Sequence, residues 1–174
     1  MTYSKATKNK IGILKNLRFE DIYKPILHHL PSNRSSVLDI GCGSGRDSRW
    51  LAKKGHSVSA VDRVIHEGLK NNLIGTDVSF YIDSLPGLEN TLEDKFDLIL
   101  CSCVWMFIPE ADRAYAERTI VSLLAPNGKL ILVTKDTHLA PFDIPLIDFH
   151  INKDLSGRDI TWLTYVYATR RPGV

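Results

Sequence analysis

Three glycines at alternate positions, in Gly41-Cys42-Gly43-Ser44-Gly45, form the pattern in this sequence that points most directly to chemistry. They follow the apolar stretch Ser36–Ile40, a predicted buried strand, and open a predicted helix over Ser44–Lys54. Because glycine has no side chain, the backbone of such a loop can approach a ligand closely. In a parallel sheet the loop would lie at the carboxyl edge of the strand, where nucleotide-like ligands bind. The pattern therefore predicts a site for such a ligand.

Two carboxylates narrow the class of ligand. Asp39 stands two residues before Gly41, where it would repel the pyrophosphate of NAD or FAD and attract a positive charge. Asp62 ends the next predicted strand, His56–Val61, where an acidic side chain can accept both ribose hydroxyls. The G-x-G-x-G spacing differs from the G-x-G-x-x-G of dinucleotide folds, and no phosphate-binding G-x-x-x-x-G-K-[ST] motif is present. S-adenosylmethionine fits these features, since it carries an α-ammonium and a sulfonium and has no phosphate.

Alternating strands and helices must position these residues. Further strands are predicted at Val78–Ile82, Phe96–Cys101 and Lys129–Thr134, with helices over Ile65–Asn72 and from Pro109 onward. Asp148–Lys153 and Ile160–Arg170 flank Ser156-Gly157-Arg158 and are predicted to form a hairpin. Such alternation implies right-handed βαβ units and a sheet covered on both faces. We therefore expect an α/β fold, Rossmann-like and doubly wound, with a mostly parallel seven-stranded sheet and a C-terminal antiparallel hairpin.

The first part of the chain differs in charge from the rest. Residues 1–36 hold seven basic and two acidic side chains, although the whole chain has a net charge of only +2. Apolar residues from Phe19 to Leu30 recur at helical spacing, and Pro25 divides the predicted helix into two pieces. We expect residues 1–35 to form a basic leader and helical cover, and residues 36–174 to form the ligand-binding domain.

Composition excludes several classes of protein. With 174 residues, 44% of them hydrophobic, the chain is long enough for one core and is not of disordered or collagen-like composition. The longest apolar stretch, Leu98–Ile108, is shorter than the roughly 20 residues of a membrane span, and no secretory signal is expected. Three cysteines indicate neither a disulfide framework nor a four-ligand zinc site, so we expect a cytoplasmic protein without a metal. His28, His29 and His150 are interpreted as surface or core residues.

Over residues 36 to 170, the sequence resembles the class I S-adenosylmethionine-dependent methyltransferases. The resemblance lies in the glycine segment, in Val58–Asp62, in Ile82-Asp83-Ser84, in Phe96–Leu100 and in Leu124–Leu130. Gly45-Arg46-Asp47-Ser48 together with Val104-Trp105-Met106-Phe107 is most similar to compact bacterial small-molecule enzymes, including the tellurite-resistance type.

The resemblance implies which residues would bind S-adenosylmethionine and its product, S-adenosylhomocysteine. Gly41, Gly43 and Gly45, with Cys42 between them, would line the methionine and ribose portion, and Asp39 would lie near the amino group. Asp62 would bind the ribose hydroxyls and Asp83 the adenine amine. The remaining cofactor contacts would come from Arg63, Ser84, Ser102 and Cys103.

The methyl acceptor is expected beyond the fourth strand. Nucleobase amino-methyltransferases carry an Asn/Asp-Pro-Pro-aromatic element there, whereas this chain has Ser102-Cys103-Val104-Trp105. Trp105 and Phe107 suggest an apolar acceptor pocket, and Lys135 could hold an acceptor carboxylate. His138 is the candidate general base, which in-line methyl transfer needs only if the nucleophile must lose a proton.

Two further functions stay open at the level of sequence. Residues 135 to 147 include Pro141 and Pro145, so the helix usual in this family is expected to be missing or reduced, and one wall of the acceptor pocket with it. The basic leader could instead bind phosphates of an RNA substrate, although nucleic acid is a less favoured partner than a small molecule. A non-catalytic S-adenosylmethionine-binding subunit is the second alternative. The chain is expected to be a monomer or a homodimer, without membrane attachment.

Overall fold

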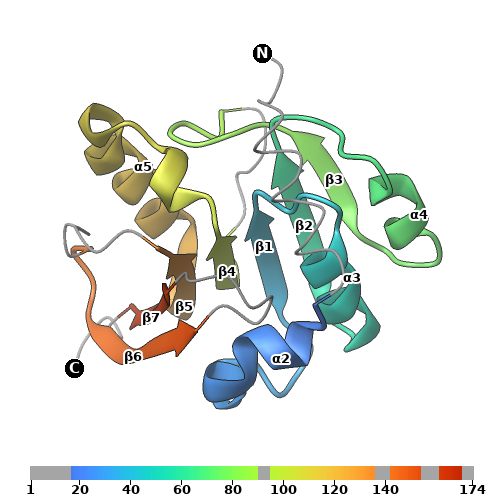
Figure 1. Ribbon diagram of the computed structural model, residues 1–174, viewed down its shortest axis with the longest axis horizontal. Helices are drawn as coiled ribbons and strands as arrows, with labels where there is room; N and C mark the ends of the chain where they lie inside the picture. The colour runs from blue at the N-terminus through green and yellow to red at the C-terminus, as the bar shows by residue number, and fades with distance from the viewer. Residues whose placement is uncertain (1–16, 90–94, 136–141, 154–160, 170–174) are drawn as a thin grey trace.

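A single sheet organises the protein. The structure, a computed structural model, describes residues 17–89, 95–135, 142–153 and 161–169, and these contain seven strands in the order β3-β2-β1-β4-β5-β7-β6 (Figure 1). Along the chain the strands are β1 (Ser36–Ile40), β2 (Ser57–Asp62), β3 (Ser79–Ile82), β4 (Phe96–Ser102), β5 (Leu124–Thr134), β6 (Leu146–Lys153) and β7 (Thr161–Ala168). Strands β1 to β5 pair in parallel, whereas β7 is antiparallel to both β5 and β6. The predicted fold class is confirmed.

Helices cover both faces of the sheet. The described helices are α2 (Phe19–Tyr23), the 3-10 helix η1 (Lys24–His29), α3 (Arg46–Lys53), α4 (Leu69–Leu73), the 3-10 helix η2 (Trp105–Phe107) and α5 (Glu110–Leu123). Alternate residues of β4 separate two buried clusters: Leu98 and Leu100 pack with α2 and α3, while Ile99 and Cys101 pack with α5. Because β4 is buried on both sides, its sequence is a continuous apolar run rather than an alternating one.

The first helical segment is broken as Pro25 predicts. It consists of α2 followed directly by η1, with Pro25 in the first turn of η1. Phe19, Tyr23 and Ile26 are each at most 2% exposed and belong to the same cluster as Val37 of β1. The α2–η1 segment (Phe19–His29) thus shares one core with the sheet.

Several element boundaries differ from the predicted ones, and left-handed residues explain two of them. Helix α3 begins at Arg46 rather than Ser44 because Gly45 precedes it with φ +77°. Helix α4 begins at Leu69 rather than Ile65, since Gly68 has φ +84° and cannot continue a right-handed helix. Strand β5 begins at Leu124 rather than Lys129, and its pairing with β4 changes register across the intervening turn.

The connection from β5 to β6 is described only in part. Residues 142–145 contain no helix, and residues 136–141 lie outside the described residues. Phe142 is 4% exposed and packs its ring against Trp105 and Tyr167, with centroids 4.9 and 5.0 Å away. An aromatic side chain thus fills part of this face of the core. Within the described ranges, no helix combines the length and the apolar character needed to cross a bilayer.

Candidate functional site

The glycine loop connects β1 to α3 at the carboxyl edge of the parallel strands. Gly41, Gly43 and Gly45 all have positive φ angles, between +57° and +77°. The amides of Gly41 and Cys42 both donate to the carbonyl of Val61, at 2.7 and 3.0 Å, so the loop is tied to the end of β2. A Cβ atom on Gly41 would lie 2.1 Å from a methyl carbon of Val104, which follows β4. Glycine is therefore required at position 41 by both conformation and space.

Asp62 occupies the end of β2 beside this loop and is 5% exposed. One of its oxygens, Oδ2, accepts a hydrogen bond from the Gly43 amide at 3.0 Å. The other, Oδ1, accepts from the Val64 amide at 3.2 Å and lies 3.2 Å from Nε2 of His66. A carboxylate can accept about four hydrogen bonds, so Asp62 retains capacity for a ligand. His66 was not predicted, although its position four residues after Asp62 is a usable signal.

Asp83 lies directly beside Asp62. Its amide donates to the carbonyl of Asp62 at 3.1 Å, because β3 pairs in parallel with β2. Its Oδ1 accepts from the amide of Ser84 at 2.8 Å, and the Ser84 side chain is exposed. Arg63, also exposed, follows Asp62 at the same edge. The fold thus brings together the four residues predicted to flank the ribose and adenine.

Asp39 lies beneath the loop rather than on its surface. It is 2% exposed, and its Oδ2 accepts a 2.5 Å hydrogen bond from the hydroxyl of Ser48. Burial, reinforced by the nearby carboxylate of Asp47, raises the pKa of Asp39 to about 7. A cation bound beneath the loop would favour the ionised form of Asp39.

Asp47 is the centre of a buried hydrogen-bonded group that the sequence did not predict. It is 6% exposed and accepts from Tyr23 at 2.9 Å and from Nε and Nη2 of Arg46 at 2.5 and 2.9 Å. Burial, and then the charge of Asp47, raise the pKa of the Tyr23 phenol, so the hydroxyl remains a donor. Burial alone would lower the pKa of Arg46, but its ion pair with Asp47 outweighs burial and raises it. The α2–η1 segment is thereby joined to the glycine loop.

Comparison with known proteins identifies this arrangement. The family model described as a methyltransferase domain matches residues 37–128, just over half of the chain. This chain belongs to the methyltransferase-domain family. The matched region extends from β1 past the start of β5, so it includes the glycine loop, Asp62, Asp83 and the end of β4.

Individual relatives agree with the family. The chain is 30% identical over 115 residues to a ubiquinone biosynthesis O-methyltransferase from Xanthomonas euvesicatoria pv. vesicatoria, covering 64% of this chain and 47% of the relative. The chain therefore spans about half the length of this curated relative. Burkholderia thailandensis 1,6-didemethyltoxoflavin-N1-methyltransferase, solved with 1,6-didemethyltoxoflavin and S-adenosylhomocysteine, has a TM-score of 0.72 at 17% identity, covering 98% of this chain and 92% of that one. The N-methyltransferase NodS from Bradyrhizobium japonicum, solved with S-adenosylhomocysteine, has a TM-score of 0.70 at 18% identity, covering 90% of each chain. These two structures establish the fold.

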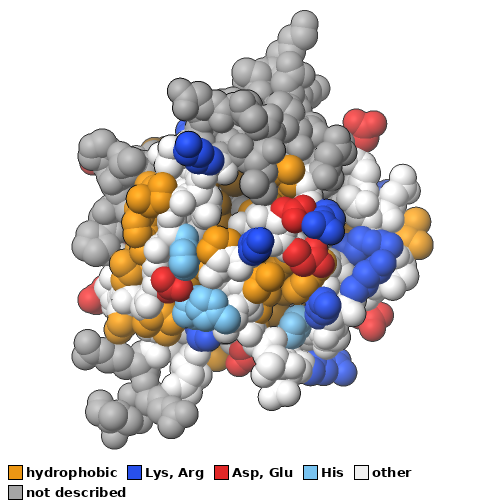
Figure 2. Space-filling view, turned by 60° about the horizontal axis from the view of Figure 1, so that its bottom comes forward, with side chains coloured by type: hydrophobic (Ala, Val, Ile, Leu, Met, Phe, Trp, Pro, Cys, Tyr) orange, Lys and Arg blue, Asp and Glu red, His pale blue; other side chains and the backbone are white. Residues whose placement is uncertain are grey.

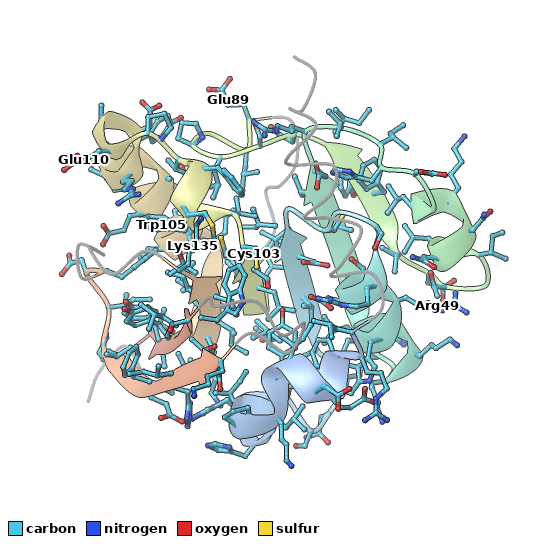
Figure 3. All side chains as sticks on the ribbon, in the orientation of Figure 1. Arg49, Glu89, Cys103, Trp105, Glu110 and Lys135 are labelled. Atoms are coloured by element: carbon cyan, nitrogen blue, oxygen red, sulfur yellow. The ribbon has the colours of Figure 1, made fainter. Side chains whose placement is uncertain are left out.

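In this methyltransferase domain, the residues predicted near the acceptor come from the ends of β4 and β5. Figure 3 shows Cys103, Trp105 and Lys135 in one region at the carboxyl edge. Cys103 has φ +61°, and its amide donates to the carbonyl of Val133 at 2.7 Å. A non-glycine residue in the left-handed region is strained, and such strain is concentrated at functional sites. Ser102 precedes it at the end of β4, with its Oγ 3.8 Å from the Cys103 sulfur.

The aromatic residues after β4 separate into a core residue and a surface residue. Trp105 is 1% exposed and belongs to the core beside α5. Its indole Nε1 has no hydrogen-bond partner among the described residues. Phe107 is 55% exposed, and Lys135 is exposed at the end of β5. His138, the predicted general base, lies outside the described residues.

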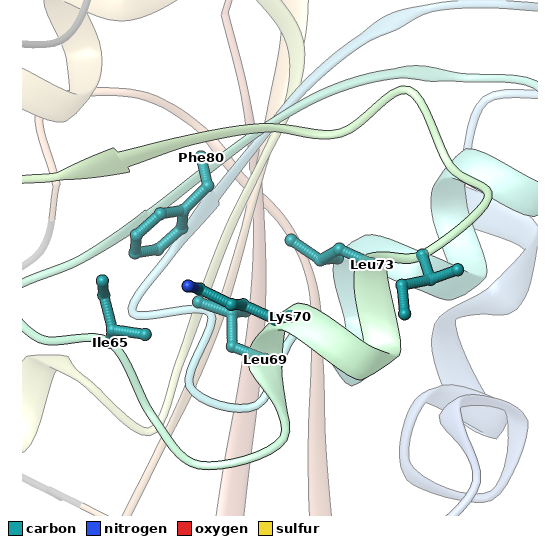
Figure 4. Close-up of a pocket in the computed structure, with 6 residues that line it drawn as sticks. Ile65, Leu69, Lys70, Leu73 and Phe80 are labelled. Carbon is teal, nitrogen blue, oxygen red and sulfur yellow. The ribbon is translucent and has the colours of Figure 1, made fainter.

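An apolar hollow of about 300 Å³ lies between α4 and β3 (Figure 4). Its lining consists of Ile65, Leu69, Lys70, Leu73, Ile74 and Phe80. The sole charged residue of this lining is a lysine, so the hollow has no carboxylate to attract a cationic ligand. The candidate site of the domain is therefore the acidic strand edge formed by Asp39, Asp62 and Asp83.

Proposed function

We propose that this chain is an S-adenosylmethionine-dependent methyltransferase that acts on a small-molecule acceptor by in-line displacement. The observation that carries the proposal is the hydrogen bond from the Gly43 amide to Asp62 at the end of β2. It couples a glycine-rich loop to a buried carboxylate, and Asp83, directly after the next strand, donates its amide to the carbonyl of Asp62. Three acidic side chains at neighbouring strand ends suit a cationic nucleoside and disfavour a diphosphate.

The residues present fit this cofactor. Asp62 has acceptor capacity left and would bind the ribose hydroxyls, and Asp83 would accept from the adenine amine. Gly41, Cys42, Gly43 and Gly45 would line the methionine and ribose portion, with Arg63 and Ser84 beside the ribose and adenine. Asp39 would attract the amino group from beneath the loop. The hydroxyl of Ser48 donates to its Oδ2 and holds the carboxylate in place. The crystallised relatives that contain S-adenosylhomocysteine support the assignment.

Catalysis would depend mainly on alignment. When bound, the cofactor supplies a methyl carbon activated by a cationic sulfur. Ser102 and Cys103 would hold the methyl-bearing end in line with the acceptor, and such alignment can lower the barrier by roughly 7–11 kcal/mol. Phe107 would bound the acceptor, with Trp105 packed behind it in the core, and Lys135 would bind a carboxylate on it. His138 would remove a proton only from an acceptor that needs it.

We make three further proposals, on the domain division, the oligomeric state and the location of the protein. One is the division into a basic leader and cover (residues 1–35) and a methyltransferase domain (36–174), in which the α2–η1 segment covers the sheet and shares its core. We also propose a monomer or a homodimer. The edge strand β6 supports the second, since it exposes Leu146, Ile147, Phe149 and Ile151 by 41–67%. The three free cysteines support a cytoplasmic location.

Calorimetry tests the cofactor assignment. We expect S-adenosylmethionine and S-adenosylhomocysteine to bind at one site per chain and NADH not to bind. Asp62→Asn should lose most of the affinity, whereas Asp77→Asn, an exposed acidic residue before β3, should leave it unchanged. Binding of NADH in place of S-adenosylmethionine, or equal affinity in both variants, would contradict the proposal.

Methyl transfer is tested separately. The protein is incubated with methyl-labelled S-adenosylmethionine and a panel of small phenols, amines and carboxylates, with bulk RNA as a further arm. Label in a small molecule supports the proposal, and label in RNA that falls steeply with salt supports the RNA alternative. Tight cofactor binding without label in any arm favours a non-catalytic partner subunit.

A further inference from the structure

Three histidines surround one carboxylate on the face where the α2–η1 segment meets β6. Asp148 of β6 lies at the centre, with its Oδ2 2.8 Å from Nε2 of His29 and 2.9 Å from Nε2 of His150. Nε2 of His28 lies 3.7 Å from the same oxygen. Figure 2 shows histidine side chains gathered beside an acidic one on this face. None of these residues belongs to the candidate cofactor site.

The fold presents this cluster from two distant segments. His28 and His29 end η1, where their rings lie 4.1 Å apart, centroid to centroid. Lys129 of β5 donates from Nζ to the carbonyl of His29 at 3.1 Å, which fixes the end of η1 against the sheet. Asp148 is held by its own strand, since its Oδ1 accepts from the amide of Phe149 at 2.8 Å. The side chains of His29 and Asp148 are 14% and 26% exposed, so the centre is partly shielded from water.

The spacing of the donor atoms suits a metal ion. One ligand atom from each of His28, His29 and Asp148 lies within 4.8 Å of the other two. Zinc bound at about 2.0–2.1 Å in a tetrahedron places its ligands about 3.3 Å apart. The observed separations from Asp148, 2.8 and 3.7 Å, bracket that value. Two imidazoles and a carboxylate are also a donor set that zinc accepts.

We propose that His28, His29 and Asp148 form a binding site for Zn²⁺, with His150 as a positioning residue that hydrogen-bonds the carboxylate. Three protein ligands leave a fourth position for water. The ion would join η1 to β6 across 119 residues of sequence and so clamp the α2–η1 segment onto the sheet. The proposal rests on this geometry alone and is independent of the methyltransferase assignment.

The experiment uses the full chain without an affinity tag, stripped with a chelator and then titrated with Zn²⁺ by calorimetry. Co²⁺ is titrated in parallel, because its visible spectrum reports tetrahedral nitrogen and oxygen ligands. We expect one ion per chain and a higher melting temperature with Zn²⁺. His28→Gln should weaken Zn²⁺ binding more than about tenfold, since even outer hydrogen-bonding partners change metal affinity about 10–100-fold.

Four variants separate the loss of a metal ligand from a loss of folding. The His28 side chain is 64% exposed, so His28→Gln should fold normally, and circular dichroism without metal checks this. Asp148→Asn should abolish binding, and His150→Ala should weaken it without removing the tetrahedral Co²⁺ spectrum. His56→Gln is the matched control, because it removes one histidine after α3 and should leave binding unchanged. Absence of Zn²⁺ binding, a stoichiometry of one ion per two chains, or wild-type affinity in His28→Gln and Asp148→Asn would overturn the proposal.

Discussion

The hydroxyl of Tyr23 donates a 2.9 Å hydrogen bond to Asp47, so a residue of α2 completes a buried group beneath the glycine loop. Tyr23 is fully buried and Asp47 nearly so. Removing the hydroxyl leaves a buried carboxylate with one partner fewer, and Arg46 is the partner that remains among the described residues. The packing of α2 and the conformation of the loop are therefore energetically linked.

We expect Tyr23→Phe to lower the free energy of unfolding by about 1–3 kcal/mol, the cost of an unsatisfied buried partner. Urea denaturation measures this change. Tyr115→Phe is the control, because Tyr115 is 45% exposed on α5 and should change stability by less than about 0.5 kcal/mol. Equal stability of the two variants would mean that the Tyr23–Asp47 hydrogen bond does not support the fold.

Asp39 should make stability depend on pH. Its pKa is raised from 3.8 to about 7 in the folded protein, so the protonated form is favoured by folding. The resulting stabilisation is fully present below about pH 4 and is lost as the pH rises through about 7. Asp39→Asn cannot titrate and should lack this loss, while its amide oxygen can still accept from Ser48. Unfolding curves between pH 4 and 8 that run parallel in the two proteins would refute the prediction.

The same titration should affect cofactor affinity. A cationic ligand interacts more favourably with the ionised carboxylate, so the affinity for S-adenosylmethionine should rise as the pH passes about 7. The Asp39→Asn protein should bind more weakly and show no such rise from this group. Calorimetry at pH 6, 7 and 8 makes the comparison, and an unchanged pH profile in the variant would separate Asp39 from the binding site.

Much of the fold could be predicted because its signals are local. The apolar run of β4 indicated a strand buried on both faces, and Pro25 indicated the break between α2 and η1. The start of α4 was predicted wrongly at Ile65, whereas the helix begins at Leu69. Gly68 has φ +84°, and the residues before it instead turn so that His66 meets Asp62.

The candidate site was only partly predictable from sequence. Residues at strand ends, such as Asp62 and Asp83, are placed by the parallel register and could be predicted. Partnerships between distant segments could not: Tyr23 meets Asp47 across 24 residues, and His29 meets Asp148 across 119. No local period encodes such contacts, because they depend on how helices and edge strands pack.

The close approach of Gly41 to Val104 gives a prediction about the loop itself. Gly41→Ala should destabilise the protein by about 2–5 kcal/mol, since it adds steric overlap to the cost of a left-handed residue. Gly75→Ala is a matched control: its φ is +71°, but nothing lies within 4 Å of the added carbon, so only about 1–2 kcal/mol should be lost. Denaturation of both variants, and of Gly41→Ala with Val104→Ala, tests the cause. Failure of the second substitution to restore stability would show that overlap with Val104 is not the reason.

His66 should act on the cofactor through Asp62. Its Nε2 lies 3.2 Å from Oδ1 of Asp62, so it orients the carboxylate proposed to bind the ribose. We expect His66→Ala to reduce S-adenosylhomocysteine affinity about 2–13-fold, the worth of one net hydrogen bond of about 0.5–1.5 kcal/mol. In the Asp62→Asn background the same change should have little further effect, because the group that His66 orients has already lost its charge. A full, additive loss in the double variant would show that His66 acts independently of Asp62.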